Sequence, residues 1–175
     1  TFRNRIGQYT SGQDLFRGSI EENILMGRKD PSVTELINVS EMVGLHEFVK
    51  RLPKGYNTNL LPGGVNVPGS VRHKIVMART LANDPKLMIM EDDLGTLESS
   101  DREKLLDLLV DPARHWTFIV VSDDPEIAKR CDMVIVMRQG EIIEQGTYAQ
   151  IKRTEHYHEV FHGKDKSRMA RNKRN

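Results

Sequence analysis

Three short runs in the second half of the chain are apolar at every position, and they constrain the fold more than any other feature. The runs are Leu87–Met90, Phe118–Val121 and Met133–Met137. Such runs are typical of strands that are buried on both faces of a parallel sheet. Helical apolar spacing separates them, at residues 101–110 and 125–130. This alternation of strand and helix predicts an α/β domain with right-handed crossovers.

The first half of the chain carries helical signals and turns instead. A short strand is predicted at residues 5–9. Ser19 and Glu22 have the spacing of a capping box, which marks the start of a helix. Glycine, proline and asparagine are dense between residues 53 and 70, and this density predicts turns. A clear helix is predicted to follow at 71–82 because its apolar residues fall on one face.

Composition narrows the class of protein. The chain has 175 residues, a net charge of +1, 38% hydrophobic and 29% charged residues, which suits one soluble domain with a packed core. No apolar run approaches the ~18 residues of a membrane-spanning helix. The lone cysteine, Cys131, excludes an internal disulfide framework and a cysteine-only zinc site. The start of the chain has no apolar stretch of a signal peptide and no initiator methionine, so we expect an excised fragment.

Two of the three apolar runs are followed by carboxylates. Glu91, Asp92 and Asp93 follow the first run, and Asp123 and Asp124 follow the second after one serine. Functional groups in α/β sheets gather at the carboxyl ends of the strands, and a magnesium–phosphate site needs carboxylates there. The alternative is that these acids cap the helices that follow. The spacing alone favours neither interpretation.

Several segments match the motifs of one known family in order and spacing. They are Leu15–Ile24, Leu52–Thr58 (Leu-Pro-Lys-Gly-Tyr-Asn-Thr), Gly64–Arg72, Ile75–Pro85, Asp132–Met137 and Gly140–Gly146. On these residues the chain resembles the nucleotide-binding domain of an exporter-type ATP-binding cassette (ABC) transporter, from just before its Q-loop to the C-terminus. The resemblance implies a P-loop NTPase-like core sheet with an inserted helical subdomain.

The resemblance also implies boundaries. A partial nucleotide-binding domain would span residues 1–163, with the helical subdomain at 18–82 and the C-terminal part of the α/β core at 83–163. Residues 164–175 carry six Lys or Arg and one acid, and we expect a basic, flexible tail there. The rest of the chain is near neutral, and no aromatic residues interleave the basic ones, so we expect no nucleic-acid partner.

The chain departs from the family where the family's residues contact ATP. The Q-loop glutamine position holds Ser11, with Gln13 two residues out of register. The signature Leu-Ser-Gly-Gly-Gln reads Val67-Pro68-Gly69-Ser70-Val71, so only Gly69 is retained. Pro68 supplies neither the amide proton nor the hydroxyl of the family's serine. Ser70 replaces a glycine whose amide approaches phosphate closely.

The remaining motifs are altered as well. The Walker B aspartate, which holds magnesium, is Glu91, and the catalytic glutamate after it is Asp92. A shift of about 1 Å at such a carboxylate can cost ~100-fold in rate. The D-loop position ends in Glu98, and the switch histidine is Asp123, whose carboxylate would repel a γ-phosphate.

The chain contains no Walker A motif, Gly-x4-Gly-Lys-Ser/Thr. In the family, the segment with this motif precedes the part that aligns with residue 1. The family binds ATP and Mg²⁺, but we expect this chain alone to bind ATP poorly. We also expect an exposed sheet edge, which a dimer or a partner could cover.

These observations predict a degenerate, non-hydrolytic ABC domain with a structural or regulatory role in dimerisation or coupling. The resemblance implies a second nucleotide-binding domain and the transmembrane domain of an exporter as partners, at the cytoplasmic face of the membrane. One alternative is a working ATPase half-site that an absent N-terminal part completes. A second alternative is a protein-interaction module that reuses the fold. The sequence does not indicate a transported substrate.

Overall fold

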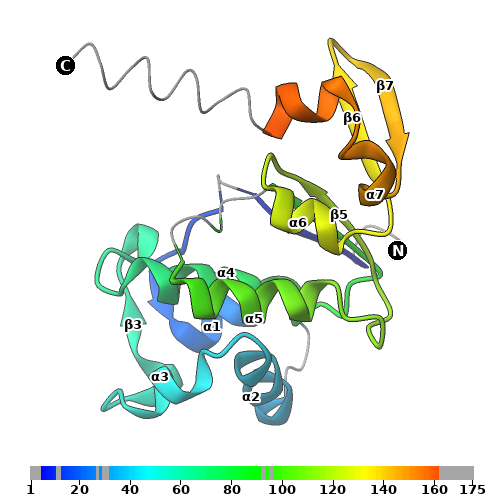
Figure 1. Cartoon of the computed structure of the whole chain (residues 1–175). Helices are drawn as coiled ribbons and strands as arrows, with labels where there is room; N and C mark the ends of the chain where they lie inside the picture. Colours follow the sequence, from blue (N-terminus) through cyan, green and yellow to red (C-terminus); the bar gives the residue numbers. More distant parts are fainter. Residues whose placement is uncertain are drawn as a thin grey trace, which may run out of the picture. The chain divides into compact units, whose positions relative to one another are not determined.

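The computed structural model describes residues 5–10, 13–26, 28, 32–91, 94 and 97–161. The chain divides into two compact units, Thr1–Val121 (the N-terminal unit) and Ser122–Asn175 (the C-terminal unit), and each is described by itself (Figure 1). Within the described residues, no helix is both long enough and apolar enough to cross a membrane.

A three-stranded parallel sheet organises the N-terminal unit. Its strands are β1 (Ile6–Tyr9), β4 (Leu87–Glu91) and β5 (Thr117–Val121), in the order β1-β4-β5. Ile6 pairs with Leu87, and Leu87 pairs with Thr117. The strands predicted in this part of the chain are therefore present, and the predicted α/β class with a parallel sheet is confirmed.

The two faces of this sheet differ. Tyr9, Met88 and Met90 point to one face and are almost completely buried. On the other face, Ile119 is 49% exposed and Val121 is 69% exposed. The predicted burial of the second apolar run on both faces is wrong for the described part of the chain, because the side chains of Ile119 and Val121 are exposed. Strand β5 pairs with β4 alone among the described strands.

The third apolar run does not join the parallel sheet, and that prediction is wrong. In the C-terminal unit, β6 (Val134–Arg138) pairs antiparallel with β7 (Glu141–Gly146). The residues that connect them, Gln139 and Gly140, have φ angles of 50° and 85°. Positive φ at both central residues is typical of a type I′ hairpin turn, which returns the chain antiparallel at once. An apolar run gives no information about strand direction.

Short helices and turns connect β1 to β4 in the N-terminal unit. They are β2 (Gly18–Ser19), α1 (Ile20–Ile24), α2 (Val33–Met42), α3 (His46–Lys50), the 3-10 turn η2 (Gly55–Asn57), β3 (Asn59–Leu60), the 3-10 turn η3 (Pro62–Gly64) and α4 (Gly69–Leu81). The predicted capping box is present: Ser19 Oγ accepts from the Glu22 amide at 3.0 Å, and the Ser19 amide donates to Glu22 Oε2 at 2.6 Å. Helix α5 (Ser99–Leu109) lies between β4 and β5 in the sequence.

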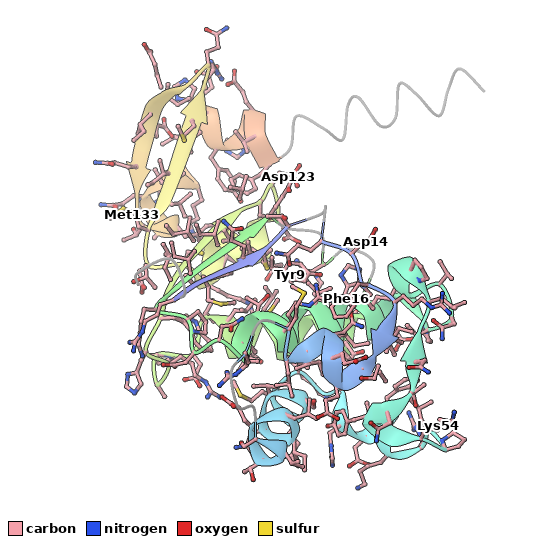
Figure 2. The ribbon with its side chains drawn as sticks, turned by 180° about the vertical axis from the view of Figure 1, so that it is seen from behind. Tyr9, Asp14, Phe16, Lys54, Asp123 and Met133 are labelled. Atoms are coloured by element: carbon pink, nitrogen blue, oxygen red, sulfur yellow. The ribbon has the colours of Figure 1, made fainter. Side chains whose placement is uncertain are left out.

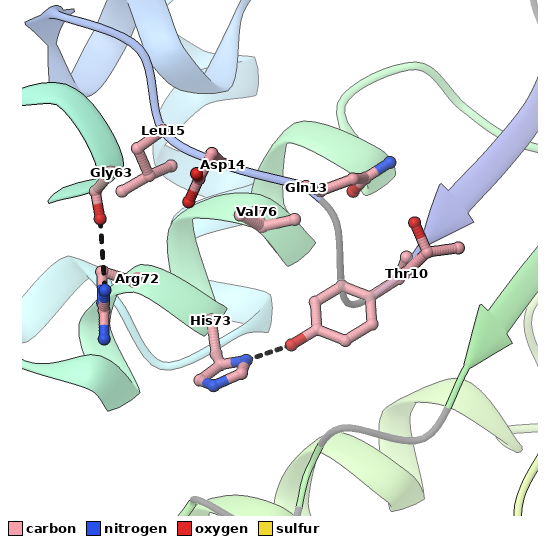
Figure 3. A pocket seen from close by; sticks show the side chains of 9 residues that line it. Thr10, Gln13, Asp14, Leu15, Gly63, Arg72, His73 and Val76 are labelled. Atoms are coloured by element: carbon pink, nitrogen blue, oxygen red, sulfur yellow. Dashed lines mark hydrogen bonds between the residues drawn. The ribbon is translucent and has the colours of Figure 1, made fainter.

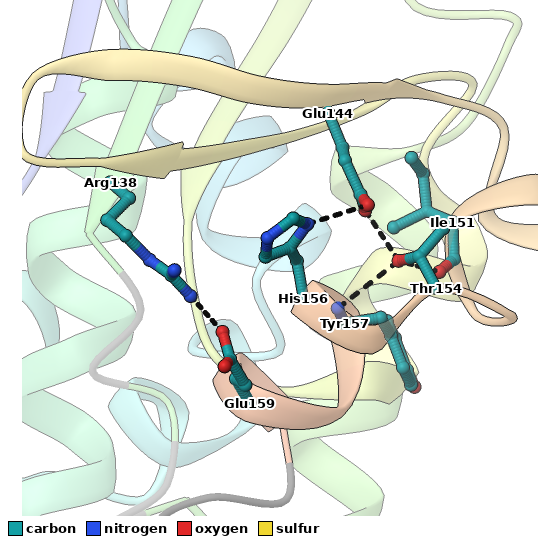
Figure 4. Close-up of polar contacts among 7 residues, drawn as sticks. All are labelled: Arg138, Glu144, Ile151, Thr154, His156, Tyr157 and Glu159. Carbon is teal, nitrogen blue, oxygen red and sulfur yellow. Dashed lines mark hydrogen bonds and ion pairs between the residues drawn. The ribbon is translucent and has the colours of Figure 1, made fainter.

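The C-terminal unit has a small core of its own. Helix α6 (Pro125–Arg130) precedes the hairpin, and α7 (Tyr148–Ile151) and the helical residues 155–161 follow it. Val136, Ile151 and Tyr157 form the buried cluster. Figure 4 shows that the Glu144 carboxylate accepts from the Thr154 hydroxyl and pairs with His156 Nδ1, and that Arg138 pairs with Glu159.

Candidate functional site

The predicted ATP-contacting residues come from several different elements of the chain, and two of them are not described. Ser11 and Asp92 lie outside the described residues, as does the basic tail at 164–175. Glu91 is the last residue of β4, the middle strand of the described parallel sheet, and its side chain is exposed. Asp123 belongs to the C-terminal unit.

The acids that follow the apolar runs do not share one role. Asp124 caps α6, because its Oδ1 accepts from the Glu126 amide at 2.7 Å. The capping interpretation is therefore confirmed for Asp124. Glu98 occupies the N-cap position of α5 but makes no side-chain capping bond there. Glu91 is the last residue of β4, and the two residues that follow it lie outside the described part of the chain.

The signature position forms the start of α4. Pro68 is extended (φ −56°, ψ 150°), and the helix begins at Gly69. The Pro68 carbonyl accepts from the amides of Val71 and Arg72 at 3.0 and 3.1 Å. Helix α4 has no side-chain cap and no acid in its first turn, so the partial positive charge of its N-terminus is not neutralised there.

A polar cavity of about 170 Å³ adjoins this helix start (Figure 3). It is bounded by the end of β1, the loop that follows, Gly63 of the turn before α4, and one face of α4. The lining residues are Tyr9, Thr10, Gln13, Asp14, Leu15, Gly63, Arg72, His73 and Val76.

Hydrogen bonds hold the walls of this cavity in place. The Tyr9 hydroxyl and His73 Nδ1 form a hydrogen bond, which links β1 to α4. The Gly63 amide donates to the Leu15 carbonyl at 2.8 Å, and Arg72 Nη1 donates to the Gly63 carbonyl at 3.2 Å. Gly63 has a φ of 68°, which favours glycine at this position.

A second polar network fixes the loop that forms one wall. Asp14 and Phe16 lie on this loop (Figure 2). The buried side chain of Asn23 accepts from the Phe16 amide at 3.1 Å and donates to the Phe16 and Ser19 carbonyls, each at 3.0 Å. Arg79 of α4 donates to Asn23 Oδ1 at 2.9 Å, to the Asn23 carbonyl at 2.7 Å and to the Asp14 carbonyl at 3.2 Å.

This network places a cation among neutral acceptors. The oxygens that Arg79 contacts belong to carbonyl and amide groups, and burial lowers the pKa of the Arg79 guanidinium. The guanidinium also lies 5.7 Å from the centre of the Phe16 ring. The loop at 14–16 is thereby bound to α1 and α4 rather than only to the strand that precedes it.

Comparisons with known proteins agree with this architecture. No family model matches the chain. A solved bacterial Atm1-family ABC exporter with ATP bound superposes with a TM-score of 0.84 at 25% identity, over 93% of this chain and 28% of that one. The uncharacterized ABC transporter ATP-binding protein YfiB of Bacillus subtilis is 30% identical over 149 residues, which is 85% of this chain. Multidrug resistance protein 1 of Entamoeba histolytica is 31% identical over 152 residues.

Most of this chain is homologous to the nucleotide-binding domain of exporter-type ABC transporters. The chain spans 26% of the YfiB protein and 12% of multidrug resistance protein 1. The homology therefore concerns the ATP-binding part of these proteins.

Sequence reasoning missed two features of this ABC-type domain. One is the cavity, because its lining comes from segments that are far apart in the sequence. The other is the link between Asn23 and Arg79. A signal for Asn23 was present, since a polar residue lies between Ile20 and Ile24 on the apolar face of α1. The four hydrogen bonds of its side chain could not be derived from that signal.

Proposed function

We propose that this chain is a degenerate ATP-binding cassette domain that does not hydrolyse ATP and serves a structural or regulatory role in an exporter-type transporter. One observation carries the proposal: Pro68 and Ser70 occupy the start of α4, where the family's signature meets the γ-phosphate.

The local geometry explains why Pro68 matters. An anion at a helix N-terminus binds to backbone amides and to capping side chains. Pro68 has no amide proton, and its side chain makes no cap. The carbonyl of Pro68 is engaged by the amides of Val71 and Arg72. The first turn of α4 therefore offers fewer donors to a phosphate than the family's Ser-Gly-Gly does.

The Walker B and switch positions support the same proposal. Glu91 and Asp92 retain two charges, but each carboxylate is displaced by one methylene relative to the family. A displacement of about 1 Å can reduce the rate of a positioned reaction ~100-fold. At the switch position, the Asp123 carboxylate would repel the γ-phosphate that a histidine would bind. Because several motifs are altered together, a domain that no longer hydrolyses ATP is favoured over a domain with one impaired site.

The partners follow from the relatives. One of them is an exporter with ATP bound, and others are named multidrug resistance proteins. We propose a second nucleotide-binding domain and an exporter's transmembrane domain as partners, at the cytoplasmic face of the membrane. We propose the subdomain division at 18–82 and 83–163, with the helical region 20–70 coupling to the transmembrane domain. ATP and Mg²⁺ are the ligands of the family, and we propose weak binding here.

The test is ATP turnover, measured with and without Mg²⁺ on the complete polypeptide that contains this chain. We expect no magnesium-dependent turnover above background. Asp92→Asn and its neighbour Asp93→Asn form a matched pair, with thermal unfolding as a check on folding. Turnover that Asp92→Asn abolishes and Asp93→Asn retains would refute the proposal and establish the working half-site instead.

A further inference from the structure

We propose that helix α4 locks strand β1 to the segment from β2 to η3 (the helical segment), so that the parallel sheet and the helical segment move as one rigid body. The inference concerns motion within the N-terminal unit, and it does not depend on the proposed loss of ATP hydrolysis. It rests on the hydrogen bonds that α4 makes to both parts.

The first link joins α4 to the middle of β1. The oxygen of the buried Thr80 hydroxyl lies 3.1 Å from the Gln8 carbonyl oxygen and 3.0 Å from that of Val76, so strand and helix share its proton. The backbone of β1 comes close to the helix here, because a Cβ at Gly7 would lie 2.7 Å from Thr80 Cγ2. With so tight a contact, the strand cannot slide along the helix without repacking.

The second link lies two turns earlier on the same helix. Tyr9 is almost completely buried, and its hydroxyl forms a hydrogen bond with His73 Nδ1 (Figure 3). His73 and Thr80 are seven residues apart in α4, which corresponds to about 10 Å along the axis of a helix. One link would act as a pivot. Two links at this spacing fix the direction of α4 relative to β1 as well as its position.

The same helix is bound to the helical segment at two points. Near the end of α4, Arg79 donates to Asn23 Oδ1 at 2.9 Å and to the Asn23 carbonyl at 2.7 Å. Near its start, Arg72 donates to the Gly63 carbonyl at 3.2 Å. These contacts reach α1 and the turn η3, so the helical segment is also held at both ends of α4.

The chain that leads from β1 to the helical segment is bound to α4 as well. Residues 11 and 12 lie outside the described part of the chain. Before them, Tyr9 is bonded to His73, and after them, the Asp14 carbonyl accepts from Arg79 at 3.2 Å. Because both links end on α4, the attachment of the strand to the helical segment does not depend on the path of the chain between them.

Helix α4 is stiff enough to transmit a displacement. It has 13 residues, and from Val71 to Leu81 it contains no glycine, proline or serine, the residues at which helices commonly kink. A displacement of the helical segment is therefore passed to β1 and then to its partner β4, which ends at Glu91. Rotation of the helical segment relative to the sheet requires the links at Thr80 and His73 to break.

The experiment measures the distance between two spin labels by pulsed electron paramagnetic resonance. The labels are attached to Asn38→Cys in α2 and Thr117→Cys in β5, two exposed positions, in the full chain with Cys131→Ser. We expect one narrow distance distribution. Thr80→Val and His73→Phe each remove one link. We expect the population at other distances to rise about fivefold in each single variant and about 30-fold in the double variant.

Two further variants serve as controls. Thr80→Ser retains the hydroxyl and should give the same distribution as the parent chain. Asn83→Ala removes a bond that stays at the end of α4, from the Asn83 side chain to the Arg79 carbonyl at 3.2 Å, and it should also change nothing. Urea unfolding identifies the variants that are folded. If the double variant does not fold, the two single variants are compared with these controls.

Two results would overturn the proposal. The first is a broad or two-peaked distribution in the parent chain, because the helical segment then already moves relative to the sheet. The second is a distribution that stays narrow in the folded variants that lack the links, because the links then do not restrain that motion.

Discussion

The network around Asn23 gives the sharpest prediction about stability. Asn23 is completely buried, and its side chain makes four hydrogen bonds to three residues: Phe16, Ser19 and Arg79. Asn23→Ala removes all four and leaves several backbone groups and a guanidinium without these partners. Each such loss costs about 1 kcal/mol net. The better helix propensity of alanine returns about 0.6 kcal/mol. We expect the free energy of unfolding to fall by about 3 kcal/mol.

Equilibrium unfolding in urea measures this change. With a slope of about 2 kcal/mol per molar urea, the midpoint should fall by about 1.5 M while the slope stays the same. The matched control is Asn83→Ala, since Asn83 is exposed and its side chain makes one bond, to the Arg79 carbonyl at 3.2 Å. We expect that variant to lose less than about 0.5 kcal/mol. Equal losses in the two variants, or a loss below ~1 kcal/mol for Asn23→Ala, would refute the reasoning.

Three further predictions concern packing and titration. A Cβ at Gly64 (φ 62°) would lie 2.7 Å from Leu15 Cδ1, whereas a Cβ at Gly55 (φ 50°) would meet nothing within 4 Å. Gly64→Ala should therefore lower the free energy of unfolding, measured in urea, by about 2 kcal/mol more than Gly55→Ala does. A hydrogen bond from Thr154 and, to a smaller extent, one from His156 lower the pKa of Glu144. The contribution of Glu144 to the stability of the fold is therefore present above pH 4.5 and is lost as pH falls through its pKa in the folded state. Thr154→Val should raise that pKa towards 4.5 in a carboxyl NMR titration; an unchanged value would contradict the assignment. Burial and, to a smaller extent, the hydrogen bond with Tyr148 raise the pKa of Tyr157 to about 12. The contribution of Tyr157 to the stability of the fold is therefore complete below pH 10 and is lost as pH rises through about 12. In an absorbance titration, Tyr148→Phe should move the last tyrosine ionisation to lower pH.

Local signals in the sequence determined much of the fold. The capping box at Ser19 and Glu22 and the helix at 125–130 appear as predicted, because caps and helix periodicity depend on neighbours a few residues apart. The first two apolar runs form adjacent parallel strands for a related reason: a helix between them predicts a crossover.

Features that depend on distant partners could not be predicted. The run at 133–137 looks like the other two, and its antiparallel pairing follows from the turn at Gln139 and Gly140. The cavity brings Tyr9 and Arg72 together across more than sixty residues of sequence. No local pattern indicates that Asp14 and Arg72 line the same cavity.

The order of the parallel sheet also has a kinetic consequence. Strand β1 pairs with β4, and Ile6 and Leu87, which are partners in that pairing, are about 80 residues apart. Closing so long a loop is slow because the chain loses entropy before the contact forms. Because the chain is synthesised from its N-terminus, the segment from α1 to α4 leaves the ribosome before β4 does. The contacts within this segment can therefore form first. Helix α4 holds β1 through the hydrogen bond from Thr80 to the Gln8 carbonyl, so we expect this segment to keep β1 in place until β4 pairs with it.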